Sequence, residues 1–142
     1  MARVVWNRAE LQRLLASESG PVGRDLAIKG ERVANEQKRL APVSPDGSHG
    51  RPPGWMRDHV KSQLGRDEIG LHVDIGTDAT TPDGHSYPMD VELGTRPHVI
   101  RSHGSYPLRD QHGNVFGHEV NHPGTEAQPF LRPSLEVLRR EV

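Results

Sequence analysis

The sequence predicts a small α+β domain with two N-terminal helices, a small antiparallel sheet with a long β-hairpin, a short middle helix and a C-terminal helix. Three observations lead to this prediction. Apolar residues recur at helical spacing before residue 40, alternate with polar residues over 69–75, and recur at helical spacing again after residue 130. With 142 residues the chain has room for one domain, spanning 1–142. The order of elements is typical of the α+β class.

The first forty residues are predicted to contain both N-terminal helices. Asn7 is a suitable N-cap for a short helix that carries three leucines, and the Ser-Gly-Pro sequence at 19–21 ends it. A second helix is predicted over about 22–40, with Val33, Gln37 and Leu40 on its apolar face and residue 29 or 30 filling one turn. Alanines at 27, 34 and 41 form a second stripe, suited either to packing within the chain or to contact with another subunit.

The middle of the chain combines a breaker-rich loop with short elements. Proline and glycine are so dense over 43–54 that we expect a loop there, either mobile or ordered only by a partner. Residues 56–64 are compatible with a strand or a short helix. Ser86 is placed to cap a short helix with Pro88 in its first turn and Gly94 at its end. A half-buried strand is predicted from the alternating apolar residues Ile69, Leu71, Val73 and Ile75.

The last third of the chain is predicted to be a hairpin followed by a helix. Segment 97–120 has the pattern of a long β-hairpin whose turn lies at 110–114. We expect Phe130 and Leu131 to anchor the C-terminal helix against the sheet, and Phe130 and Leu135 to be buried. Pro133 is tolerated in the first turn of that helix. Its apolar face is made by Leu131, Leu135, Leu138 and Val142.

Composition points to a thin core and to self-association. Hydrophobic residues make up 32% of the chain and aromatic residues 4%, with 15 glycines and 12 prolines. A chain this polar buries little apolar surface by itself, so we expect partner subunits to cover what it leaves open. The net charge of −1 gives no overall basic field for nucleic-acid binding. The absence of cysteine excludes disulfides and thiolate metal sites.

The same sequence makes a membrane location unexpected. No apolar run approaches the roughly 20 residues that a membrane-spanning helix requires. The first residues lack the apolar stretch of a signal peptide. We therefore expect a soluble chain that is made in a reducing cytoplasm.

One stretch matches a metal-binding motif. Residues 118–122 read His-Glu-Val-Asn-His, which fits the HExxH pattern of zinc metalloproteases. That chemistry needs a helix, so that both imidazoles lie on one face. Here Gly117 precedes the motif, and Pro123 biases His122 towards extended backbone. On a strand the two histidines lie about 13 Å apart and do not share an ion. We therefore expect no metal site, and a metallohydrolase is kept only as an alternative.

Five histidines fall between residues 98 and 122, which fits either polar hairpin positions or a metal-binding or pH-sensitive contact.

Other catalytic patterns are missing from the sequence. No serine occupies a Gly-x-Ser-x-Gly elbow. Asp46, Asp83 and Asp110 lie in glycine-rich turns, where aspartate usually closes the turn with its own side chain. We therefore expect no catalytic residue and no cofactor, and a non-catalytic assembly protein is the favoured class.

Three segments, in order, resemble the neck or tail-completion proteins of long-tailed bacteriophages. The first is 34–43, a helix end reading Ala-Pro-Val, with Gly-Trp-Met-Arg-Asp at 54–58 after it. The second is Tyr-Pro-Met-Asp-Val-Glu-Leu-Gly-Thr at 87–95. The third, at 122–135, begins His-Pro-Gly-Thr and ends Pro-Phe-Leu-Arg-Pro-Ser-Leu. The chain departs from the family at Pro88, where alanine is usual, and in a longer loop over 44–53.

The resemblance implies a structural virion protein at the head–tail junction. It would form a closed homo-oligomeric ring, a hexamer rather than a dodecamer, between portal-side adaptor or stopper proteins and the tail terminator or tail tube. DNA would pass through its lumen without sequence-specific contact. The alternatives within the virion are a tail terminator or a minor head protein. The residues that the resemblance marks as structural or assembly positions are Ala41, Pro42, Val43, Val91, Glu92, Gly94, Thr95, His122, Pro123, Gly124, Phe130, Leu131 and Leu135.

These motifs also have simple structural interpretations. Gly94 is expected to end a helix in a left-handed conformation. Pro123 and Gly124 are expected to form a turn, which gives His122 a structural rather than a catalytic place. Exposed loops rich in proline and glycine are then available to dock on the rings above and below.

Overall fold

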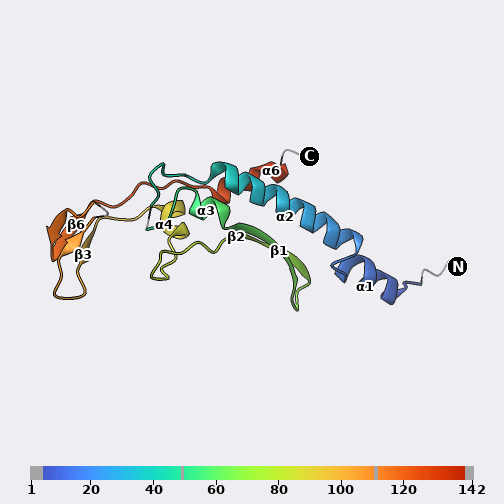
Figure 1. Cartoon of the computed structure of the whole chain (residues 1–142). Helices are drawn as coiled ribbons and strands as arrows, with labels where there is room; N and C mark the ends of the chain where they lie inside the picture. The colour runs from blue at the N-terminus through green and yellow to red at the C-terminus, as the bar shows by residue number, and fades with distance from the viewer. Residues whose placement is uncertain (1–4, 49, 111, 140–142) are drawn as a thin grey trace.

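A long helix and a slender hairpin give the molecule an extended outline, as Figure 1 shows. The computed structural model describes residues 5–48, 50–110 and 112–139. The helices are α1 (Arg8–Ala16), α2 (Pro21–Leu40), α3 (Trp55–Asp58), α4 (Pro88–Leu93), α5 (Leu131–Ser134) and α6 (Glu136–Arg139). The strands are β1 (Val60–Arg66), β2 (Leu71–Thr77), β3 (His98–Arg101), β4 (Leu108–Arg109), β5 (Val115–Gly117) and β6 (Glu119–His122). The predicted α+β class is confirmed.

Both N-terminal helices start where the sequence predicts. The Asn7 side chain accepts a hydrogen bond from the backbone N–H of Glu10, which caps α1. Pro21 is the first residue of α2, where its missing N–H costs nothing. Helix α2 ends at Leu40, because Ala41 precedes a proline and leaves the helical region.

Helix α2 packs closely on the hairpin of β1 and β2, which pair antiparallel from Val60↔Thr77 to Arg66↔Leu71. Gly30 makes this approach possible. A Cβ atom there would lie 2.5 Å from the Ser62 hydroxyl oxygen and 2.6 Å from a Val73 methyl group. Gly30, and not Lys29, therefore occupies the position on the apolar face of α2 where the sequence has no apolar residue.

A small core lies where the C-terminal end of α2 meets α3, α4 and the start of α5. Its buried residues are Ala41, Met56, Ala79, Tyr87 and Phe130. Phe130 is fully buried, as predicted, but it packs in this cluster rather than against a sheet. The alanine stripe of α2 also turns inward, since Ala34 and Ala41 are buried within the chain. For these two positions the structure favours packing within the chain.

The strands form three separate two-stranded antiparallel ladders. One is the β1–β2 hairpin on α2. The other two lie in segment 96–124, which we call the arm, where β3 pairs with β6 and β4 pairs with β5. This segment is the predicted long hairpin. We call the remaining described residues the body. In Figure 1 the arm projects away from the body as the orange hairpin.

Two sequence expectations of burial are wrong. Ile69 is 97% exposed, because it lies in the turn before β2, where the Asp67 side chain accepts its backbone N–H. Leu135 is 51% exposed, because the C-terminal helix is interrupted there between α5 and α6. Ser134 takes the buried position instead, and its hydroxyl donates to the Leu131 carbonyl. Val142, expected on the same helical face, lies outside the described residues.

In the part of the chain that the structure describes, no helix is both long enough and apolar enough to span a bilayer.

Candidate functional site

Two of the segments that contain the marked residues meet at a buried carboxylate. Glu92 is only 4% exposed and caps the N-terminus of α5. One of its carboxylate oxygens accepts the backbone N–H groups of Phe130 at 2.7 Å and Leu131 at 2.8 Å, and the other accepts that of Arg132 at 3.1 Å. These N–H groups have no partner within the helix, so the carboxylate satisfies them across 38 to 40 residues of sequence. We call this arrangement the Glu92 cap.

Two opposing effects set the pKa of Glu92. Burial raises it, because a charged carboxylate loses its hydration. The hydrogen bonds from Leu131, Phe130 and Arg132, together with the charge of Arg132, lower the pKa and prevail. The net pKa therefore lies below the ordinary glutamate value of 4.5, and the cap is ionised at neutral pH.

A second link closes the base of the arm beside the Glu92 cap. Thr95 and Thr125 exchange both backbone hydrogen bonds, at 3.0 and 3.1 Å, and their hydroxyl oxygens lie 3.0 Å apart. The glycines that precede the two threonines allow this close approach. A Cβ atom on Gly94 would lie 2.6 Å from the Thr125 carbonyl oxygen, and Gly124 has a φ of 87° with the Thr95 carbonyl against it.

The expected conformation of Gly94 needs one correction. Its φ is 70°, so glycine is required, but its ψ is 174° rather than that of a left-handed helical residue. The backbone therefore leaves α4 extended and runs directly into the link with Thr125. Ser86 does not cap α4 as predicted either. Tyr87 occupies the N-cap position, and no side chain makes the capping hydrogen bond.

The structure brings most of the marked residues together. Ala41 and Phe130 share the core cluster, with Val91 and Leu131 packed against it. Pro42 and Val43 line a hollow beside Val91. His122 ends β6 and its Nδ1 accepts the backbone N–H of Gly124, a structural place in the turn that Pro123 begins. Leu135 is the exception, since more than half of it is open to solvent.

The proline- and glycine-rich loop over 43–54 contacts the chain's own body. The Arg51 guanidinium donates to the backbone carbonyls of Thr80 and Thr81. It also lies over the Trp55 ring, 4.4 Å from the ring centre. His49, within this loop, is outside the described residues. The mobility of the loop and its ordering by a partner remain predictions.

The HExxH residues lie on the arm, in extended backbone rather than on a helix. His118 occupies a bend between β5 and β6, with its Nδ1 2.9 Å from the Ser102 hydroxyl oxygen. Glu119 accepts a hydrogen bond from Arg101 at 2.8 Å. The His122 ring faces that of His98 across the ladder, with ring centres 5.0 Å apart. The three motif residues therefore contact three different neighbours.

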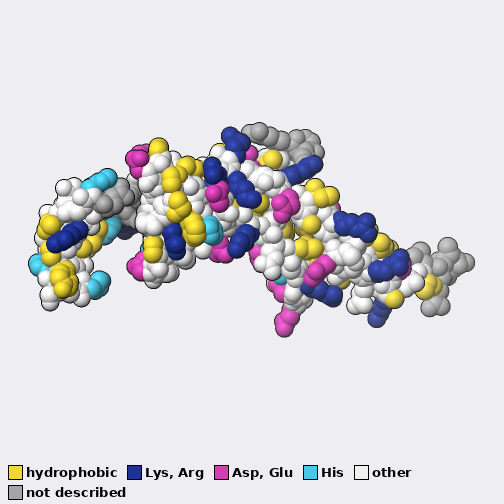
Figure 2. All heavy atoms as spheres, in the orientation of Figure 1, with side chains coloured by type: hydrophobic (Ala, Val, Ile, Leu, Met, Phe, Trp, Pro, Cys, Tyr) yellow, Lys and Arg dark blue, Asp and Glu magenta, His cyan; other side chains and the backbone are white. Residues whose placement is uncertain are grey.

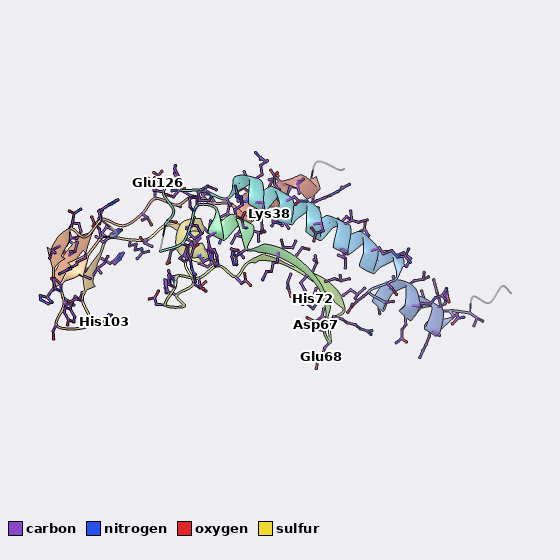
Figure 3. The ribbon with its side chains drawn as sticks, in the orientation of Figure 1. Lys38, Asp67, Glu68, His72, His103 and Glu126 are labelled. Carbon is purple, nitrogen blue, oxygen red and sulfur yellow. The ribbon has the colours of Figure 1, made fainter. Side chains whose placement is uncertain are left out.

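Other ionisable groups serve local structure. Asp110 accepts the side-chain amide of Asn114 and the backbone N–H groups of Asn114 and His112, and these bonds lower its pKa. In Figure 3 Asp67, Glu68 and His72 lie at the far end of the β1–β2 hairpin, well away from His103 on the arm. Among the described residues, no group of three or more His, Cys, Asp or Glu side chains could hold a metal ion.

The arm carries the largest set of exposed apolar side chains. Figure 2 shows hydrophobic and histidine side chains gathered on it. Tyr106 is 83% exposed and Phe116 is 53% exposed. Exposed apolar residues on a two-stranded hairpin are typical of a surface that another chain covers. The other large apolar side chains exposed there are Val99, Ile100 and Val115.

Sequence reasoning missed several residues that fix the site. The partners of Glu92 could not be found, because a cap across 38 residues leaves no local pattern. Arg51 gave no signal within its loop. Gln37, by contrast, could be recognised from the sequence, because it is a polar residue in the apolar stripe of α2. The structure places it in the interior at 3% exposure.

The candidate site is therefore a junction of motif residues from which an exposed arm projects. Its groups hold backbone segments together and present an apolar surface, an arrangement suited to assembly. No family model, no curated protein and no solved structure matches this chain.

Proposed function

We propose that this chain is a structural subunit of a tailed-phage virion, which forms a closed ring in the head-to-tail connector. The ring would join portal-side proteins to the tail and surround the DNA channel. The observation that carries the proposal is the Glu92 cap. It links the second segment that resembles neck proteins to the third, so the two motifs act as one structural unit.

Two further observations support an assembly role. Ala41, from the first segment, packs in the same core as Phe130 from the third. The arm leaves Tyr106 and Phe116 largely exposed, as expected of a chain that becomes complete only beside other copies. Contacts between different surfaces of identical subunits close into rings when the rotation closes, which suits a part that encircles DNA.

The charge of the chain fits passage of DNA without specific binding. The formal net charge is −1. A strongly basic lining would hold phosphate groups, whereas a neutral or mildly acidic lumen lets the duplex slide. We therefore propose a lumen of that kind, with neighbouring neck rings above and below.

Cryo-electron microscopy of a virion that carries this chain tests the proposal. The expected result is a six-fold ring of this chain on the head–tail axis. Density at the far end of the tail tube, or inside the head shell, would instead assign the chain to another virion role. An isolated copy outside any ring on that axis would overturn the proposal.

A further inference from the structure

A groove in the body leaves a buried polar group without a partner. The groove has a volume of about 310 Å³ and lies between α2, β2 and α5. Val33 and Gln37 line it from α2, Val73 and Ile75 from β2, and Leu131, Arg132 and Leu135 from the C-terminal segment.

Gln37 is the unusual member of this lining. The residue is 97% buried, and its side-chain oxygen Oε1 has no hydrogen-bond partner among the residues that the structure describes. Buried polar atoms in folded proteins are nearly always paired, so an unpaired acceptor in a groove indicates a missing donor. Leu135 lies in the same groove with half of its surface uncovered. The groove therefore has uncovered apolar surface beside an unpaired acceptor, to which the Arg132 guanidinium in the same lining makes no hydrogen bond.

The arm has the complementary features. One of its faces has a mostly apolar hollow lined by Ile100, Leu108, Phe116 and Val120, together with Arg109 and Asp110. The outer edges of a two-stranded ladder leave backbone N–H groups unpaired, and Tyr106 adds an exposed hydroxyl, so the arm offers hydrogen-bond donors. Its five exposed large apolar residues present on the order of 500 Å². That is a large part of the about 800 Å² that each partner buries in a stable interface.

The arm of a given copy is directed away from its own groove. In Figure 1 it projects from α4 on the side away from α2, whereas the groove lies against the C-terminal half of α2. We propose that the arm of one copy docks on the α2–β2–α5 groove of the next copy, covering Leu135 and supplying a donor to Gln37. Arm and groove are different surfaces, so the contact is head-to-tail. The inference rests on the proposed ring and names the contact that builds it.

Complementation between two variants tests this contact. Phe116→Asp places a charge on the arm, and Leu135→Asp places one in the groove. Both residues are about half exposed, so both variants should fold, which circular dichroism verifies. In sedimentation velocity each variant alone should associate at least about a hundredfold more weakly than the natural chain. A mixture of the two should form one-to-one dimers, because it contains one intact arm and one intact groove.

The matched control is Ile69→Asp, at an exposed apolar residue outside both surfaces, which should associate like the natural chain. The docking proposal is overturned if either single variant associates normally. It is equally overturned if the mixture stays monomeric, or if the natural chain is monomeric up to about 1 mM. An arm-to-arm contact predicts that Leu135→Asp alone associates like the natural chain, and is thereby separated from the proposed one.

Gln37→Met separates a role of Gln37 in the contact between copies from a role in the stability of the monomer. Methionine fills the same space without an unpaired oxygen, so the melting temperature of the monomer should rise. Self-association should nevertheless weaken by about tenfold, because the arm donor loses its acceptor. Unchanged association would overturn the assignment of Gln37 to the contact.

The outcomes separate this inference from the proposed function. Head-to-tail association by a chain that is absent from the virion neck would leave the docking contact intact and refute the proposed function. A neck ring that assembles normally from Phe116→Asp subunits would refute the docking contact and leave the proposed function intact.

Discussion

The body and the arm differ in the contacts that stabilise them, and the two phenylalanines of the chain show the difference. Phe130 is fully buried among residues from four segments of the body. Phe116 lies on the arm and is 53% exposed. The body is stabilised by a small core and a buried carboxylate, whereas the arm consists of short ladders with exposed apolar side chains. Stability is therefore concentrated in the body, and exposed apolar surface is concentrated in the arm.

The sharpest test of this comparison is the same substitution at both phenylalanines. Phe130→Ala should lower the free energy of unfolding by about 4 kcal/mol, since it empties a packed core position. Phe116→Ala should change it by less than about 1 kcal/mol in the monomer. Urea denaturation of the two variants measures both values. Similar losses at the two positions would show that the arm is part of the folding core.

The Glu92 cap should give the next largest effect. Glu92→Ala leaves three backbone N–H groups without their acceptor and should cost about 3 kcal/mol of stability. Glu92→Gln keeps one acceptor oxygen and should cost less. Glu126→Ala, at an exposed residue near the same junction, is the matched control and should fall within about 0.5 kcal/mol of the natural chain. If Glu92→Ala left the free energy of unfolding unchanged, the Glu92 cap would not be a stabilising contact.

The cap should also depend on pH. The folded pKa of Glu92 is lowered below the ordinary 4.5, so its stabilisation is complete above that value. As the pH falls through the folded pKa, the carboxylate is protonated and the stabilisation is lost. Other carboxylates titrate in the same range, so the quantity to measure is the stability difference between the natural chain and Glu92→Gln. That difference should shrink on acidification, and a constant difference from pH 7 to 3 would contradict the assigned cause.

Leu135→Asp should have a small effect in the monomer, within about 1 kcal/mol, because the residue is half exposed. Thermal melting at low protein concentration, where copies are apart, measures it. Loss of the folded state would show that the helix interruption at this residue closes in solution.

The smallest expected effect is at the HExxH residues. His118→Ala removes a contact with the Ser102 hydroxyl on an exposed part of the arm, so stability should change by less than about 0.5 kcal/mol. Elemental measurement of the purified chain should find no stoichiometric zinc. One zinc per chain that disappears in His118→Ala would contradict the structural interpretation of this motif.

Local patterns predicted most elements of the fold. Asn7 caps α1, α2 ends before Pro42, and the hairpin over 97–120 forms with its turn near Asp110, because each of these depends on neighbouring residues. Gln111 in that turn lies outside the described residues. Residues 56–64 contain both of the alternatives left open, a short helix and then a strand.

Long-range contacts limited the prediction of the site. Leu135 fits an apolar helical stripe, but the helix breaks there and Ser134 is buried instead, which depends on how α5 meets the body. Likewise nothing near Glu92 indicates that its partners lie around residue 131. The motif resemblance selected both ends of this contact, although it did not indicate the bond between them.

The paired threonines at the base of the arm also bear on how such a chain can vary. Thr95 and Thr125 are hydrogen-bonded neighbours, so the chain leaves the body and returns to it at one place. The arm is therefore equivalent to an insertion, whose length and sequence can change while its two ends stay fixed. A short turn joining these threonines would preserve the route through the body, and a different hairpin could be grafted at the same point. The proposed docking surface and the scaffold are thus separable modules, open to independent change.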